Sequence, residues 1–187
     1  MKSLISFLFI MAAVQLFAQI NPNYISPSKV GNMNLQTGKV FYQSDISSAV
    51  NFQKLAEKIK SKEQVYSVFN LNSVTPKEIK GTITNFQLNI DQYGVKRKKL
   101  ASFLTLPLNA TFNVENVEGR NKVTVGSIWF KNLPGDKSRE HYNIESFVTS
   151  KSGTAFIKKK KTLKSLAILE KNLDELFKAA TTVPVGF

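Results

Sequence analysis

Two runs of positive charge are the residues in this chain whose spacing best supports a chemical role. The two basic tracts consist of Lys96, Arg97, Lys98, Lys99, Lys158, Lys159, Lys160 and Lys161. Ammonium and guanidinium groups gathered in this way attract phosphates and carboxylates. A single tract of this kind is commonly only a solvated charge run. The second tract, however, directly precedes a predicted helix, where cations oppose the helix dipole by about 0.3 kcal/mol or more each. This unfavourable placement favours a functional reason, and we predict an anion-binding site formed by both tracts.

Residues for catalysis or metal binding are sparse. His141 is the only histidine and the chain has no cysteine, so a zinc site or a serine triad would depend on one imidazole. We expect His141 to lie in a strand with its ring partly buried. Acidic residues such as Glu170, Asp174 and Glu175 lie among lysines on a predicted helix, where solvated ion pairs are the ordinary explanation. The sequence therefore predicts no enzyme, no metal site and no cofactor.

The amino terminus has the features of a cleavable secretory signal. Lys2 precedes an apolar stretch from Leu4 to Val14, and the small residue Ala18 offers a cleavage point. The apolar stretch is about half the roughly 20 residues that a membrane-spanning helix needs. We therefore expect an exported protein, periplasmic or secreted, without a retained anchor. Because the chain lacks cysteine, we expect no lipid anchor and no disulfide.

The organisation that must position the basic tracts is a single α+β domain. Residues 1–18 are the predicted signal, 19–37 a flexible lead-in, 38–182 the domain and 183–187 a tail. The domain is expected to be an antiparallel sheet of about six to seven strands, with a short N-terminal helix and a long C-terminal helix packed on one face. Alternating apolar residues predict strands at 38–45, 65–71, 78–91, 100–114, 122–131, 140–149 and 154–158.

Finer features of these elements also follow from the pattern of apolar residues. A change of phase predicts a bulge near Thr84 and Asn85. The first helix presents Phe52, Leu55 and Ile59 on one face, and the last covers residues 162–180 with a leucine-rich stripe. If the six strands after the first helix follow one another as an up-and-down meander, both basic tracts lie at one end of the sheet. The turn with Glu115 and Glu118 then lies at the other end, together with Lys151.

Several segments together resemble a known family. They are GKVFYQSDI at 38–46, NFQKLAEKI at 51–59, KEIKGTI at 77–83 and ENVEGRNKVTVGSIWF at 115–130. In this combination the chain resembles an uncharacterised secreted domain family of Bacteroidota, and the turn at Gly119 and Arg120 is the most distinctive part. The resemblance implies a fold like that of the TATA-box-binding protein, with a curved antiparallel sheet that carries helices on one side. It implies no established activity, so it supplies no active site.

Three functions remain open at this point. The first is a non-enzymatic envelope or secreted binding domain, whose basic end binds anionic groups of glycolipid, lipid headgroups or peptidoglycan. The second is a pocket for a lipid or another apolar ligand between the curved sheet and the helix at 163–180, and an apolar cavity there would favour it. The third is an unrecognised hydrolase, which needs convergent polar groups in a cleft. Nucleic acid is not an expected partner, because few aromatic residues accompany the tracts.

Overall fold

The computed structural model describes residues 25–26, 28–46, 68–131 and 140–181, together with positions 52, 54–57 and 59. The predicted signal at 1–18 and the tail at 183–187 lie outside the described residues. The strands are β1 (Ile25–Ser26), β2 (Lys29–Val30), β3 (Met33–Gln36), β4 (Lys39–Ile46), β5 (Phe69–Val74), β6 (Glu78–Phe86), β7 (Leu108–Val117), β8 (Arg120–Lys131) and β9 (His141–Asn143). The helices are α3 (Glu145–Val148), α4 (Lys160–Thr181) and three 3-10 turns, η2 (Asp91–Tyr93), η3 (Arg97–Lys99) and η4 (Ser102–Thr105).

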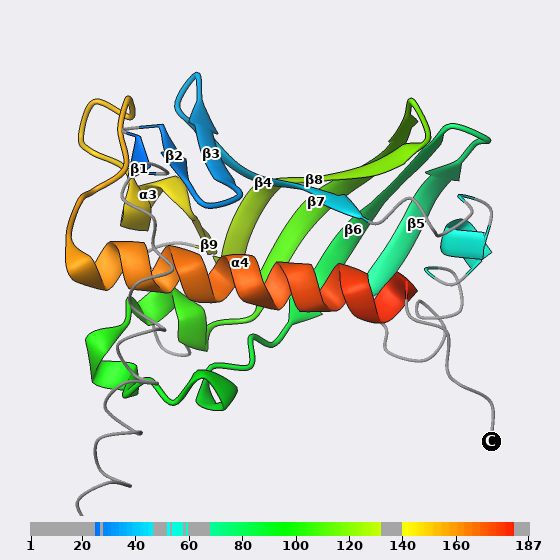
Figure 1. Cartoon of the computed structure of the whole chain (residues 1–187). Coiled ribbons are helices and arrows are strands. Elements are labelled where there is room, and N and C mark those ends of the chain that lie inside the picture. The colour runs from blue at the N-terminus through cyan, green and yellow to red at the C-terminus, as the bar shows by residue number, and fades with distance from the viewer. Residues whose placement is uncertain are drawn as a thin grey trace, which may run out of the picture.

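The predicted α+β class is confirmed. All described strands pair antiparallel in one sheet with the order β1-β2-β3-β4-β8-β7-β6-β5, and β9 pairs with the end of β8. The sheet curves like a saddle, and α4 runs across one of its faces (Figure 1). The up-and-down meander predicted for the strands after the first helix is confirmed from β5 to β9, because β5, β6, β7 and β8 are neighbours in chain order and β9 pairs with β8. The strands before that helix do not continue this order. β4 pairs with β8, so the chain crosses from one half of the sheet to the opposite edge before β5.

The core lies between α4 and the sheet. The helix buries a stripe at a spacing of three and four residues, as a helix on a sheet requires, and the stripe consists of Leu166, Leu169, Leu173 and Phe177. From the sheet, Phe69 and Phe112 meet Phe177 with ring centroids 5.6 and 5.7 Å apart. Each fully buried side chain of this size contributes about 1.5 to 3 kcal/mol. The apolar face predicted for the first helix is also confirmed, since Phe52, Leu55 and Ile59 are buried.

The lead-in predicted for 19–37 is wrong for the part of it that the structure describes. This part contains the strands β1, β2 and β3, and Val30, Met33 and Leu35 are buried. The prediction failed because polar turn residues dominate the composition of this segment. Three buried apolar side chains are nevertheless enough to attach such short strands to the core. The sheet therefore includes residues before position 38.

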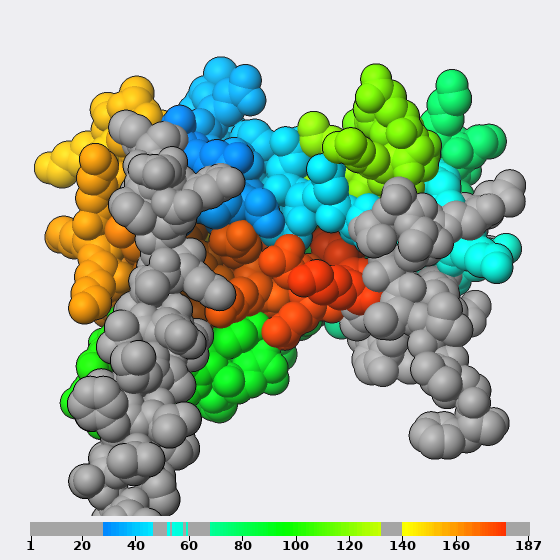
Figure 2. All heavy atoms as spheres, in the orientation of Figure 1, coloured from blue at the N-terminus to red at the C-terminus, as the bar shows by residue number. Residues whose placement is uncertain are grey.

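The fifteen-residue strand predicted at 100–114 is confirmed only in its second half, which belongs to β7. Its first half is the turn η4, and β7 begins only at Leu108. Phe103 and Leu104 are both buried, whereas adjacent residues of a strand point to opposite faces of the sheet. Pro107 therefore precedes β7 and does not interrupt it. The segment from residue 87 to residue 107 forms a lobe under α4, on the side away from the sheet (Figure 2).

Three further predictions concern irregular strands. The bulge near Asn85 is confirmed, because the pairing of β6 with β7 shifts between Ile83 and Phe86 and Asn85 has a φ of 54°. The buried side chain of Asn109 accepts the Asn85 N–H at 3.0 Å and so satisfies the bulge. The strand predicted at 140–149 is mostly wrong, since β9 covers only His141–Asn143 and α3 follows it. The strand predicted at 154–158 is a single bridge between Thr149 and Phe156.

Candidate functional site

The first basic tract lies on the turn η3 in the lobe under α4. Arg97 forms a two-pronged ion pair with Asp91 of η2, with Nη2 to Oδ2 at 2.8 Å and Nε to Oδ1 at 3.3 Å. The hydrogen bond from Arg97, and then its charge, lowers the pKa of Asp91 below its ordinary value. Arg97 therefore braces the loop. The exposed Lys96, Lys98 and Lys99 remain as the cations that face water.

The second basic tract straddles the start of α4. We predicted that the whole tract precedes the helix, but α4 begins inside it at Lys160. Lys159, directly before the helix, already takes part in its hydrogen bonding, because its carbonyl accepts the Leu163 N–H at 3.1 Å. No acidic residue lies in the first turn of α4. The cations therefore remain opposed to the helix dipole, as the sequence indicated.

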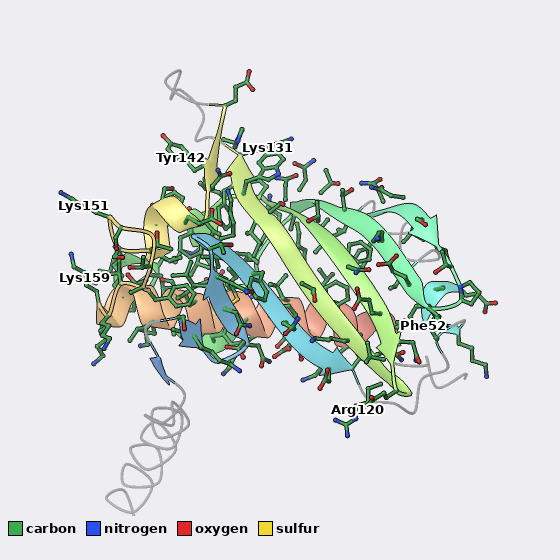
Figure 3. The ribbon with its side chains drawn as sticks, turned by 90° about the horizontal axis from the view of Figure 1, so that it is seen from above. Phe52, Arg120, Lys131, Tyr142, Lys151 and Lys159 are labelled. Atoms are coloured by element: carbon green, nitrogen blue, oxygen red, sulfur yellow. The ribbon has the colours of Figure 1, made fainter. Side chains whose placement is uncertain are left out.

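The two tracts meet at one end of the molecule. The Ala101 N–H, two residues after the first tract, donates to Ser165 Oγ at 2.8 Å, and Ser165 Oγ donates to the carbonyl of Lys161 at 2.7 Å. Ser165 is fully buried, so this link ties the lobe to the first turns of α4. We call the two tracts together the basic end. Lys151 lies towards the same end of the molecule as Lys159, not at the opposite one as predicted (Figure 3).

The opposite end is formed by the β7–β8 hairpin. Glu118 and Gly119 make its two-residue turn with φ of 51° and 77°, the left-handed conformations that a tight hairpin turn needs. Arg120 marks this hairpin on the side of the sheet far from Lys159 (Figure 3). Next to it lies an open, polar hollow of about 450 Å3. Its lining consists of Lys29, Asn32, Gln43, Ser44, Asp45, Val117, Glu118, Arg120 and Lys122.

Two carboxylates of α4 attach the first strands to the helix. The buried Tyr42 hydroxyl donates to Asp174 Oδ1, and the Asn32 N–H donates to Glu170 Oε1 at 3.0 Å. Burial, and next the hydrogen bond to Asp174, raises the pKa of the Tyr42 phenol. Burial also raises the pKa of the Glu170 carboxyl, against the hydrogen bond from Asn32. The prediction that these residues form only solvated ion pairs is therefore wrong.

Sequence reasoning missed these attachments, although a signal for one of them was present. Glu170 falls four residues after Leu166 and three before Leu173, in the middle of the buried stripe. A charged residue at that position of a helix needs a hydrogen-bond or ion-pair partner, because burial of an unpaired charge is costly. The role of Ser165 carries no comparable signal, because a serine is common on any helix.

The elements of an active site do not come together in the described part of the chain. His141 lies in β9 as predicted, but its ring is exposed and sits 5.3 Å from the ring of Trp129. No group of three metal-ligating side chains occurs among the described residues. The described contact between α4 and the sheet is filled by rings such as Phe177, which argues against the apolar pocket there.

None of the described helices combines the length and the apolar character that a bilayer crossing requires. No family model and no curated protein matches the chain. Solved structures do resemble it. A TBP-like protein from Parabacteroides distasonis has a TM-score of 0.50 at 17% identity, over 80% of this chain and 97% of that chain.

A DUF4468 family protein from Bacteroides ovatus also has a TM-score of 0.50, at 16% identity, over 88% of this chain and 96% of that chain. Neither neighbour bears the name of an enzyme. At this identity the likeness shows the fold alone. The TBP-like architecture expected from the resemblance is therefore confirmed, and both neighbours come from Bacteroidota, the phylum that the resemblance named.

Proposed function

We propose that this protein is an exported, non-enzymatic binding domain that attaches to anionic groups of the cell envelope through its basic end. The observation that supports the proposal is the link from Ala101 through Ser165 to Lys161, which ties the two tracts to the same turns of α4. Tracts 59 residues apart in sequence therefore act as one surface.

The charge balance of this surface favours an anionic partner. Within the described residues, the ion pairs are Lys80 with Glu78 and Arg97 with Asp91. Lys158 and Lys159 are exposed and take part in neither. Cations that no carboxylate neutralises attract phosphates most strongly at low ionic strength. A lipid headgroup layer presents such phosphates at high density.

Binding of the full chain to phospholipid vesicles tests the proposal. Phosphatidylglycerol vesicles present negative charge and phosphatidylcholine vesicles do not, so the second kind measures any binding that is independent of charge. The double variant Lys158→Gln with Lys159→Gln should bind phosphatidylglycerol about 30-fold more weakly, because each lysine near an anionic surface is worth about 1 kcal/mol.

The matched control removes two exposed lysines elsewhere, Lys54→Gln with Lys77→Gln, and lowers the net charge by the same amount. We expect this control to retain most of the affinity for phosphatidylglycerol. Equal losses in both double variants would mean that net charge alone matters, and affinity that ignores salt would rule out an electrostatic site.

A further inference from the structure

The hollow at the end opposite the basic end has the dimensions of a ligand site. Its volume of about 450 Å3 falls within the roughly 300 to 1,000 Å3 typical of small-ligand pockets. Three separate parts of the fold supply its walls: the turn between β2 and β3, the last residues of β4 and the β7–β8 hairpin. Every lining residue belongs to the described part of the chain.

One wall of the hollow is a strand edge that no other described strand pairs with. β3 pairs with β4 only as far as Tyr42, and one further bond joins the Gln43 N–H to the Asn32 carbonyl at 2.9 Å. β4 continues to Ile46, and there β8 is its sole partner among the described strands. Backbone groups of alternate residues point to the same side, so those of Asp45 follow Gln43 towards the hollow. Such an edge accepts an extended chain as an additional strand.

The charges around this edge favour a carboxylate. Lys29, Arg120 and Lys122 outnumber Asp45 and Glu118 in the lining, and none of the five forms an ion pair within the described residues. An arginine offers a planar pair of donors that matches a carboxylate. The two acidic residues disfavour a polyanion. The complementary ligand is therefore an extended main chain with one terminal carboxylate.

The walls are held in place before any ligand arrives. The turn between β2 and β3 is fixed by Glu170, which accepts the Asn32 N–H at 3.0 Å and packs against Gly31 so closely that a Cβ there would clash. Gln43 Nε2 donates to Thr124 Oγ1 at 3.2 Å across the neighbouring strand. Walls that need no ordering on binding spare the ligand that entropic cost.

We propose that this hollow binds the C-terminal end of a short peptide. The peptide adds as a strand to that edge of β4 and directs its carboxylate towards Lys29, Arg120 and Lys122. The site shares no residue with the basic end, so it does not depend on the function proposed above.

A nuclear magnetic resonance titration of the 15N-labelled full chain tests this assignment. The probe is trialanine at up to about 10 mM, a concentration that detects weak binding, and its C-terminal amide is the comparison ligand. Trialanine should shift the backbone amides of Asp45 and Ile46, and the amide should bind at least fivefold more weakly (roughly 1 kcal/mol for a charge-assisted hydrogen bond).

Two variants separate this site from the basic end. Arg120 is exposed, so Arg120→Gln should keep the dispersed spectrum of the folded protein and weaken trialanine binding about tenfold. Lys159→Gln should leave trialanine binding unchanged. The proposal is overturned if trialanine shifts no amide of β4, if the amide form binds equally well, or if the shifts are confined to the basic end.

Discussion

The hydrogen bond between Tyr42 and Asp174 should be among the strongest single attachments of α4 to the sheet. Tyr42 is 1% exposed and projects from β4 towards the helix, where its hydroxyl donates to Asp174 Oδ1. The variant Tyr42→Phe keeps the ring and removes only this donor. A hydrogen bond to a charged group contributes about 1.5 to 3 kcal/mol. We therefore expect the free energy of unfolding to fall by about 2 kcal/mol and Tm to fall by about 4 to 8 °C.

Urea unfolding followed by the fluorescence of Trp129, the only tryptophan, measures this loss. The single variant Asp174→Ala and the double variant complete a cycle that isolates the pair, and we expect a coupling energy of at least about 1 kcal/mol. If Tyr42→Phe changes the free energy of unfolding by less than about 0.5 kcal/mol, or if the two losses simply add, the bond does not stabilise the fold and the reasoning fails.

Two further predictions concern the same helix. Burial raises the pKa of Glu170 above its unfolded value, so its charge destabilises the fold at neutral pH and this cost disappears as the pH falls through the raised pKa towards the ordinary one. In Glu170→Gln the amide oxygen can still accept the Asn32 N–H. In urea unfolding this variant should have a free energy of unfolding at least as large as that of the parent at pH 7, and the difference between the two should narrow towards pH 4. A clearly lower free energy of unfolding for the variant at pH 7 would contradict this. Phe177→Ala removes a ring that is 1% exposed and should cost about 3 to 5 kcal/mol, measured by the same unfolding assay, whereas a cost under about 1 kcal/mol would mean that the core closes around the gap.

Periodicity predicted the parts of the fold that bury one continuous face. The stripe from Leu166 to Phe177 could belong only to a helix, and β8 alternates without interruption from Val123 to Val125. It failed where a segment buries apolar residues in irregular backbone. Leu104 and Leu106 alternate like a strand, but Phe103, directly before Leu104, is buried as well and packs against Phe130 and Phe147. The 3-10 turn η4 allows these adjacent residues to be buried together.

The basic end also has features that the sequence shows and features that only the fold creates. The basic tracts are visible in the sequence because charge needs no partner to be recognised. Their meeting is not visible, since it depends on the hydrogen bond from Ala101 to Ser165 across 64 residues. The ion pair that removes Arg97 from the free cations is likewise a property of the turn that brings Asp91 close to it.

The helix α4 serves as the common support of both ends through two polar positions in or beside its apolar stripe. Ser165 holds the lobe with the first basic tract, and Glu170 holds the turn that walls the hollow. These positions are five residues apart, which is about 7.5 Å along a helix, and their partners belong to different segments. Substitutions at sites without shared partners usually act additively. One end can therefore lose its attachment while the other keeps its geometry, and for this reason the two binding proposals stand or fall separately.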